Sequence, residues 1–219
     1  YITARIKKLL TAFNIEEISH TKAKQISGGE QQRVAICCAL AEAPKLLMLD
    51  EPLAHLDQIN AKIIKDYLWK FIKSEKITTL FVTHNPLDAL AYSSRLAIVN
   101  KGKITESGNP KKLYNQPNDL YTAELLGNCF KINRNLIPEK HLRKNRGSYY
   151  LRPEMIQINE TGNLKTEVVN CIYYGDRQLI QSKIKTSKIE FYTVSSMKIS
   201  KGDTLNITIN FEDLIFIPK

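Results

Sequence analysis

Two short apolar runs, separated by one amphipathic helix, constrain the fold of this chain most. The run Lys45–Asp50 leads directly into Glu51, and the run Ile77–Thr83 leads directly into His84. Between them, apolar residues recur at the spacing of one helix face: Ile59, Ile63, Tyr67 and Phe71. A strand, a helix and a second strand in this order predict parallel strands, buried on both faces, in an α/β layer.

Further elements are predicted on both sides of this unit. The chain opens with an amphipathic helix, marked by apolar residues at helical spacing: Ile6, Leu9, Leu10 and Phe13. A helix from Gly29 to Ala43 should end at Pro44, and Pro86 suits the first turn of a helix through Tyr92. Leu96–Val99 is expected to be a third strand, followed by a turn at Lys101-Gly102.

After about Gly127 the helical periodicity fades and short β-rich runs take its place. They are Tyr149–Leu151, Thr166–Tyr173, Gln178–Ile184, Ile189–Val194 and Thr204–Ile209, with turns at Gly175-Asp176 and Gly202-Asp203. Several short strands at this spacing predict a small barrel or sandwich. The chain is therefore expected to contain two domains, residues 1–127 and 128–219.

Composition narrows the function classes only a little. The net charge of +10 permits contact with nucleic acid or an anionic membrane, but the lysines are spread along the chain, which favours a solvated surface. No apolar run approaches the roughly 20 residues that span a bilayer. The four cysteines stand in no metal-ligand spacing, so we expect reduced structural thiols, with Cys37 and Cys38 on a buried helix.

The segment Ser27-Gly28-Gly29 is a candidate phosphate site. Two glycines allow close approach of the backbone, and the helix that follows offers unpaired N–H groups and a positive dipole end. Ser27 can cap this helix or donate its hydroxyl to the same phosphate. An ordinary capped turn is the alternative interpretation of these three residues.

The strand ends supply candidate groups for phosphoryl transfer. Asp50 can hold Mg²⁺, usually through water, and Glu51 can orient or deprotonate an attacking water. Such acids also occur as helix caps, and a strand-end histidine such as His84 is often structural. The order of a glycine-rich helix start, strand-end acids, Asp57 and His84 within about 60 residues favours the functional interpretation.

This series resembles the ATP-binding-cassette (ABC) ATPases. Residues 26–33 are similar to their signature motif, usually written Leu-Ser-Gly-Gly-Gln, residues 46–51 to Walker B with the catalytic glutamate, and Leu56-Asp57 to the D-loop. The resemblance implies catalytic roles for Glu51 and the switch histidine His84, and a magnesium role for Asp50. It implies ATP contacts for the following residues: Ser27, Gly28, Gly29, Gln31 and Asp57. In this family a second ATPase subunit holds the nucleotide that the signature touches.

The second half resembles the TOBE domain, an oligonucleotide-binding (OB)-like barrel appended to importer ATPases. The resemblance rests on Arg152-Pro153-Glu154 and on residues 108–117, which follow the pattern Gly-x-Pro-x-x-x-Tyr-x-x-Pro. The expected architecture is thus a partial P-loop NTPase domain of α/β class followed by a small all-β barrel. The family carries sugars, polyamines, ferric iron, sulfate or molybdate. It implies permease partners, an indirect solute-binding protein and a place on the cytoplasmic face of the membrane.

Some residues depart from the family pattern. Ile26 replaces the usual Leu, Cys38 stands where relatives carry Arg, and no Gly-x-x-x-x-Gly-Lys-Ser/Thr loop occurs. Because the chain opens at Tyr1 within a helical pattern, we expect an N-terminally truncated ATPase that does not hydrolyse ATP alone. Two alternatives stay open, namely a soluble ABC-type ATPase acting on nucleic acid or ribosomes, and an inactive remnant. Nucleic acid is the less favoured partner.

Overall fold

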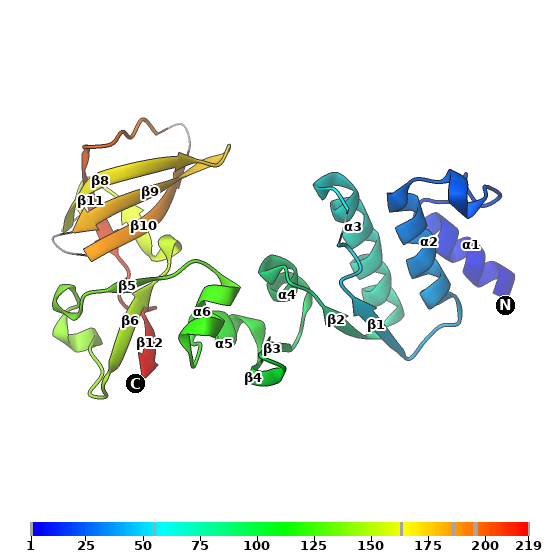
Figure 1. Cartoon of the computed structure of the whole chain (residues 1–219), viewed down its shortest axis with the longest axis horizontal. Helices are drawn as coiled ribbons and strands as arrows, with labels where there is room; N and C mark the ends of the chain where they lie inside the picture. The colour runs from blue at the N-terminus through cyan, green and yellow to red at the C-terminus, as the bar shows by residue number, and fades with distance from the viewer. Residues whose placement is uncertain (1, 55, 163, 185–186, 195–196, 219) are drawn as a thin grey trace. The chain divides into compact units, whose positions relative to one another are not determined.

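The computed structural model describes residues 2–54, 56–162, 164–184, 187–194 and 197–218 (Figure 1). His55, part of the predicted aspartate loop, lies outside this set. The chain divides into two compact units, residues 1–85 and 86–219.

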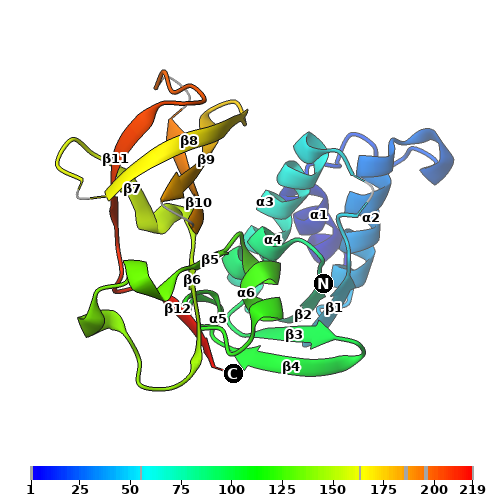
Figure 2. The ribbon, with the colours of Figure 1, turned by 60° about the vertical axis from the view of Figure 1, so that its left-hand side comes forward.

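The first unit packs helices against one face of a small parallel sheet. Its elements are α1 (Ile2–Ala12), the 3-10 turn η1 (Ala23–Gln25), α2 (Gly28–Ala41), β1 (Leu46–Asp50), α3 (Gln58–Glu75) and β2 (Thr78–Val82). Helices α1 and α2 lie side by side, as do α2 and α3 (Figures 1 and 2). The order of elements predicted for this half is confirmed, with helix ends shifted by one or two residues.

The sheet β1–β2 is covered on one face only. The strands are parallel and in register from Leu46 opposite Thr78 to Asp50 opposite Val82. Leu47 and Leu49 face the core, whereas the alternate side chains are exposed, including Leu46, Met48, Leu80 and Val82. The prediction of strands buried on both faces is therefore wrong for this chain. Both strands have apolar side chains on both faces, but the described helices bury only one of them.

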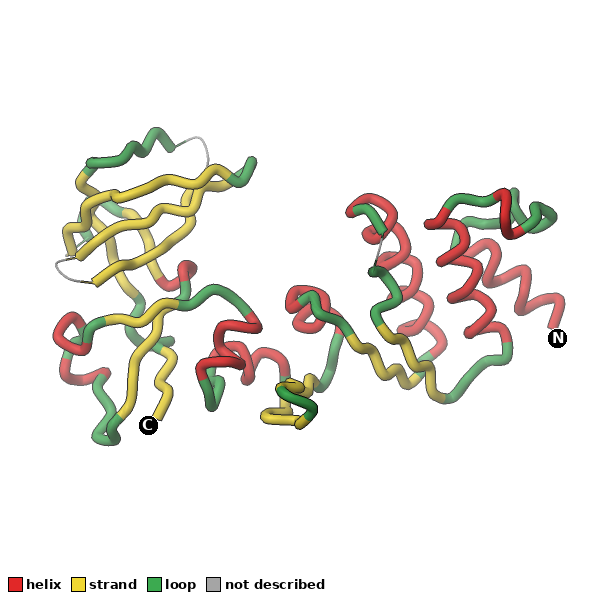
Figure 3. Tube along the Cα trace, in the orientation of Figure 1, coloured by secondary structure: helices red, strands yellow, loops and turns green. Residues whose placement is uncertain are grey.

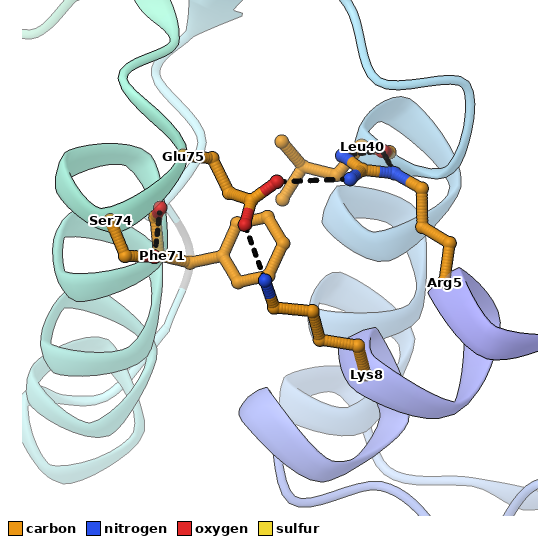
Figure 4. A network of polar contacts seen from close by, with 6 residues as sticks. All are labelled: Arg5, Lys8, Leu40, Phe71, Ser74 and Glu75. Atoms are coloured by element: carbon orange, nitrogen blue, oxygen red, sulfur yellow. Dashed lines mark hydrogen bonds and ion pairs between the residues drawn. The ribbon is translucent and has the colours of Figure 1, made fainter.

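An ionic network holds α1 against α2 and α3 (Figure 4). The Arg5 guanidinium donates to the carbonyl oxygen of Leu40 at 2.8 and 3.0 Å and to Glu75 Oε2 at 3.0 Å. Lys8 donates to the other oxygen of Glu75, and both cations lie over the ring of Phe71. The hydrogen bonds from Lys8 and Arg5 hold the pKa of Glu75 below its ordinary value. Glu75 thus ties the last turn of α3 to the first helix.

The second unit is dominated by strands (Figure 3). Its helices are α4 (Pro86–Tyr92), α5 (Pro110–Asn115), α6 (Leu120–Leu126) and the 3-10 turns η2 (Arg134–Leu136), η3 (Glu139–His141) and η4 (Pro153–Met155). Its strands are β3 (Leu96–Asn100), β4 (Lys103–Gly108), β5 (Phe130–Ile132), β6 (Gly147–Leu151), β7 (Ile156–Ile158), β8 (Leu164–Tyr173), β9 (Arg177–Ile184), β10 (Ser187–Val194), β11 (Thr204–Ile209) and β12 (Ile215–Pro218). All five β-rich runs predicted beyond Gly127 are confirmed as strands.

The strand predicted at Leu96–Val99 forms, but in a different sheet from the one expected. β3 turns through Lys101-Gly102, where Gly102 has a φ of +74°, and pairs with β4 in an antiparallel hairpin. The predicted strand and its turn are therefore confirmed, but β3 belongs to a separate two-stranded sheet and not to the parallel layer of β1 and β2. A turn this tight favours the hairpin partner over a distant strand.

The β-rich part curls toward a barrel around one apolar core. A five-stranded antiparallel sheet runs in the order β10-β9-β8-β11-β7, and its edge strands β10 and β7 approach each other. A second sheet has the order β12-β6-β5 and contacts β10 through β5. The most deeply buried apolar side chains come from both sheets and include Leu151, Ile180, Ile189, Phe191, Ile207 and Ile215. The predicted all-β barrel is thus confirmed in class.

A fully buried arginine joins helices α5 and α6 to this β-rich part. The Arg152 guanidinium donates to the carbonyl oxygens of Tyr114 at 3.0 Å, Ala123 at 3.1 Å and Asn128 at 3.3 Å. It also lies 3.8 Å from the centre of the Tyr114 ring, whose hydroxyl is paired with Glu154. Burial and this hydrogen bond raise the pKa of Tyr114 to about 12. Residues on both sides of the expected boundary at 127/128 therefore share one set of contacts, while the two-domain division stays a prediction.

The two adjacent cysteines of α2 differ in burial. Cys37 is buried, and desolvation raises the pKa of its thiol to about 12, whereas Cys38 is exposed, so the prediction of burial is wrong for Cys38. Adjacent residues of a helix differ by about 100° in direction, which points them at different surroundings.

Among the described residues, no helix combines the length and apolar character needed to cross a membrane.

Candidate functional site

The predicted catalytic residues meet at the carboxyl ends of β1 and β2. Asp50 is the last residue of β1 and lies opposite Val82, the last residue of β2. Glu51 Oε2 lies 2.7 Å from Nδ1 of His84, and both side chains are open to solvent, at 41% and 75% exposed. Groups 33 residues apart in sequence thus make a direct hydrogen bond at the edge where α/β sheets bind ligands.

The backbone of Glu51 sets the direction of its carboxylate. Its N–H donates to the carbonyl oxygen of Val82 at 3.0 Å and so continues the β1–β2 ladder by one bond. Its φ is +42°, in the left-handed region that residues other than glycine rarely adopt. The chain therefore turns sharply just after the strand while the side chain stays beside His84.

The start of α2 is the predicted phosphate site, and its own side chains cap it. The Ser27 hydroxyl accepts from the N–H of Glu30 at 3.4 Å, and Glu30 Oε2 accepts from both the N–H and the hydroxyl of Ser27, each at 2.8 Å. This is a reciprocal capping box. The hydrogen bonds from the Ser27 backbone and side chain hold the pKa of Glu30 below its ordinary value.

The two glycines of this tip differ in their surroundings. Gly28 is exposed and has open space where a Cβ would lie, whereas Gly29 is buried against Asn60 of α3. A Cβ on Gly29 would lie 3.1 Å from Asn60 Oδ1, which is tighter than ordinary contact. Ser27 and Gly28 are thus accessible to a ligand. Gly29 instead allows the start of α2 to lie close to the start of α3.

Asp57 connects this tip to α3. Its Oδ1 accepts from the N–H groups of Ile59 and Asn60, both at 3.0 Å, and its Oδ2 accepts from the side-chain amide of Asn60. These bonds, chiefly those from Asn60, lower the pKa of Asp57. Asp57 is therefore the N-cap of α3, and Asn60 lies between Asp57 and Gly29.

Two glutamines of α2 are held by the protein itself. The Gln31 amide donates to the carbonyl oxygens of Ala23 and Ile26 at 3.0 and 3.1 Å, so this predicted ATP contact is turned back toward η1. The Gln32 amide donates to the carbonyl oxygen of Pro52, directly after Glu51. Gln32 thus links α2 to the loop after β1, which begins with Glu51.

Sequence reasoning passed over Glu30, Asn60 and Gln32. The pattern Ser27-x-x-Glu30 is the sequence signature of a capping box and could have identified Glu30. When residues 26–30 are aligned with the usual signature motif Leu-Ser-Gly-Gly-Gln, the final Gln of the motif corresponds to Glu30 and not to Gln31. The contacts of Asn60 and Gln32 depend on tertiary packing, for which the sequence holds no local signal.

Asp50, at the end of β1, is placed to bind a magnesium ion that keeps most of its waters. Among the described residues no group of three or more His, Cys, Asp or Glu side chains is arranged to hold a metal. Mg²⁺ is commonly bound by one or two carboxylates together with water and substrate phosphates. The exposed carboxylate of Asp50 meets that requirement as one ligand of such a set.

The chain is similar in sequence to known proteins. A sequence model described as "ABC transporter" matches residues 1–54, which include the tip of α2 and both strand-end acids. The iron(III) import ATP-binding protein FbpC of Haemophilus influenzae is 30% identical over 97% of the chain. The spermidine/putrescine import protein PotA of Legionella pneumophila is 31% identical over 95%, and the sulfate/thiosulfate import protein CysA of Mesostigma viride is 31% identical over 80%.

The chain spans only part of each relative, namely 66% of FbpC, 64% of PotA and 54% of CysA. The match nevertheless extends through both units of the structure, because it covers nearly the whole chain in the first two cases. A family model over the signature and Walker B residues, together with relatives of one class along the rest, gives a single assignment. The chain belongs to the ABC transporter family of ATP-binding proteins.

Proposed function

We propose that this chain forms part of the ATP-hydrolysing, energy-coupling subunit of a membrane ABC importer. The observation that carries the proposal is the contact between Glu51 and His84 beside Asp50, at the carboxyl edge of a parallel pair of strands. The relatives named as import ATP-binding proteins support the importer class. The complete enzyme would be an ATPase with ATP and Mg²⁺ as its ligands.

Glu51 would act on the attacking water, and His84 would contact the terminal phosphate. Glu51 is the group placed to orient a water and take its proton, because its carboxylate is exposed and accepts hydrogen bonds when ionised. If Nδ1 of His84 donates to Glu51, Nε2 of the neutral ring is only an acceptor. A hydrogen bond from Nε2 to a phosphate oxygen then requires the charged imidazolium, in which both ring nitrogens are donors.

The other predicted residues would complete the site. Asp50 would hold Mg²⁺ through water, and that ion would offset charge on the phosphates. Ser27 and Gly28 would face the terminal phosphate of a nucleotide bound to a second ATPase subunit, and the buried Gly29 would support them through its close approach to Asn60. Asp57 would act across the same contact between subunits.

A further element must cradle the phosphates. The 219 residues contain no Gly-x-x-x-x-Gly-Lys-Ser/Thr loop, whose backbone and lysine would bind the β- and γ-phosphates. We therefore infer that these residues alone do not hydrolyse ATP. The subunit would work at the cytoplasmic face of the membrane, bound to permease subunits and served indirectly by a solute-binding protein. Solute choice would rest with those partners.

The test is Glu51→Gln in a polypeptide that carries these 219 residues together with an upstream phosphate loop. ATP binding should be retained while turnover falls about 10²- to 10⁴-fold, the usual contribution of a general base. Glu42→Gln is the matched control, because it removes an exposed carboxylate at the far end of α2. Turnover that survives Glu51→Gln would remove Glu51 from the role of base. Glu51-dependent turnover by the 219 residues alone would contradict the need for a separate cradle.

A further inference from the structure

Half of the net charge of the chain lies in the segment that leads from β5 to β6. Residues 131–146 contain six cationic side chains and one carboxylate, Glu139, which gives the segment a formal charge of +5 out of the +10 of the whole chain. All six cations are exposed, namely Lys131, Arg134, Lys140, Arg143, Lys144 and Arg146. Within the described part of the chain none of the six forms an ion pair, so the protein leaves this charge without a close partner.

The segment is anchored to the core of the β-rich part. Ile132 and Ile137 are only 2% and 5% exposed and belong to the apolar core. The backbone N–H of Arg143 donates to the Tyr149 hydroxyl, and the Arg143 guanidinium lies 5.0 Å from the centre of the Phe216 ring. In Figures 1 and 2 the chain between β5 and β6 leaves the sheets as one projecting loop. The cations are thus positioned before a partner arrives, which reduces the conformational freedom lost on binding.

The segment lacks the features by which proteins recognise nucleic acid. Residues 131–146 contain no Phe, Tyr or Trp, and the ring of His141 packs 6.0 Å from that of Phe211, so no aromatic platform is offered to unpaired bases. The helical turns η2 and η3 have three residues each, too few to lie in a groove of a duplex. What remains is a cluster of exposed cations, within the range of about four to eight Lys and Arg that recognise anionic lipid headgroups.

We propose that residues 131–146 form a docking surface for the anionic headgroups of a phospholipid bilayer. The argument for this partner is complementarity of charge, because headgroup phosphates form a continuous anionic plane and the cations of one projecting loop can meet several of them together. Docking would hold the β-rich part against the membrane surface. The inference goes beyond the proposed function, since it concerns neither ATP nor a permease.

The experiment is flotation of the 219-residue chain with phosphatidylcholine vesicles that contain about one third phosphatidylglycerol, in about 0.1 M salt. The chain should float with these vesicles and not with pure phosphatidylcholine. The triple variant Lys140→Gln, Lys144→Gln, Arg146→Gln should bind about 100-fold more weakly, because each cation near an anionic surface contributes about five-fold. All three positions are exposed, so the thermal unfolding of the variant should match that of the wild type.

The matched control is the triple variant Lys165→Gln, Lys198→Gln, Lys201→Gln. It removes the same charge from exposed positions of the same unit. Residues 197–203, which carry two of these lysines, lie at the other end of the β-rich part from the loop between β5 and β6 (Figures 1 and 2). Because distant exposed charges are screened by salt, this variant should bind within about two-fold of the wild type. Equal losses in the two triple variants would overturn the docking surface, since general attraction would then explain the binding.

Two further results would also overturn the proposal. One is a failure of the chain to float with anionic vesicles, which would show that residues 131–146 are a solvated surface. The other is a first triple variant that keeps its vesicle binding but loses binding to a labelled DNA duplex, which would assign the segment to nucleic acid. ATP turnover of the longer polypeptide, measured without lipid, should be unaffected by this variant. Either proposal can therefore fail while the other stands.

Discussion

The units 1–85 and 86–219 handle their polar groups in opposite ways. In the first unit the charged groups of the strand ends are exposed, and the sheet that holds them is covered on one face. In the second unit the most prominent charge, Arg152, is fully buried and bonded to carbonyl oxygens on several elements. Polar groups that stay accessible can meet a ligand, whereas groups satisfied inside the fold contribute rigidity.

The largest expected effect on this contrast comes from Arg152→Met. The variant would leave the buried carbonyl oxygens of Tyr114, Ala123 and Asn128 without their donor, which should cost about 3 kcal/mol of unfolding free energy. Denaturant unfolding followed by far-ultraviolet circular dichroism would measure the loss in the strand-rich unit. The fluorescence of Trp69, on α3 of the first unit, would report the other unit and should not change.

Arg146→Met is the control, because Arg146 is exposed in the same unit and its loss should be nearly neutral. Equal shifts of the circular dichroism and Trp69 transitions in Arg152→Met would contradict the division of the chain into independent units.

A smaller effect should distinguish the two signature glycines. Gly28→Ala is expected to raise stability by roughly 0.5–1 kcal/mol, since helical Ala is favoured over Gly and the site is open. Gly29→Ala should lower it by about 1 kcal/mol or more, because the new Cβ would crowd Asn60. Thermal unfolding monitored by Trp69 fluorescence would record both changes.

Asn60→Ala provides the second half of a double-mutant cycle. It removes the crowding atoms, so Gly29→Ala should become neutral or favourable in that background. An unchanged penalty would place the cause of the Gly29 requirement in the backbone and not in Asn60.

The smallest effect concerns Glu75, whose pKa is lowered by Lys8 and Arg5. A lowered carboxyl pKa stabilises the fold above the ordinary value of 4.5, and this contribution is lost as the pH falls through the lowered pKa. Glu75→Gln should therefore cost up to about 1 kcal/mol at pH 7 in low salt, and nothing once the carboxyl is protonated. Urea unfolding at pH 7, and at a pH low enough to protonate Glu75, would measure this difference in unfolding free energy. A penalty that persisted in strong acid would mean that packing, and not charge, holds Glu75.

The sequence predicted most of this architecture because the periodic segments are locally consistent. The spacing of apolar residues identified α1 and α3, and Pro44 marked the end of α2. The turn glycine at 175 marked the hairpin of β8 and β9, and the one at 202 marked the turn before β11. The short strands β5, β7 and β12 carry too few residues to show an alternation, so only the structure revealed them. The exposed face of β1–β2 was missed because hydrophobicity predicts that a face can be buried, and does not show what buries it.

The candidate site shows the same limit. Strand ends and their following residues could be placed from the chain alone, which is why Glu51 and His84 were expected at one edge. Contacts that depend on helix packing, such as Asn60 against Gly29, have no sequence signal. Gln31 illustrates the reverse case, since a residue chosen by motif has its amide engaged with nearby carbonyl oxygens. The roles of all these residues stay predictions.

The left-handed backbone at Glu51 implies a compromise between stability and activity. An L-residue held at a φ of +42° costs about 1–2 kcal/mol compared with a relaxed conformation, and glycine would relieve most of it. Glycine would also delete the carboxylate that meets His84. If Glu51 has its proposed role, the strained backbone is the cost of keeping a carboxylate at this position, and stabilising substitutions there would be expected to cost function.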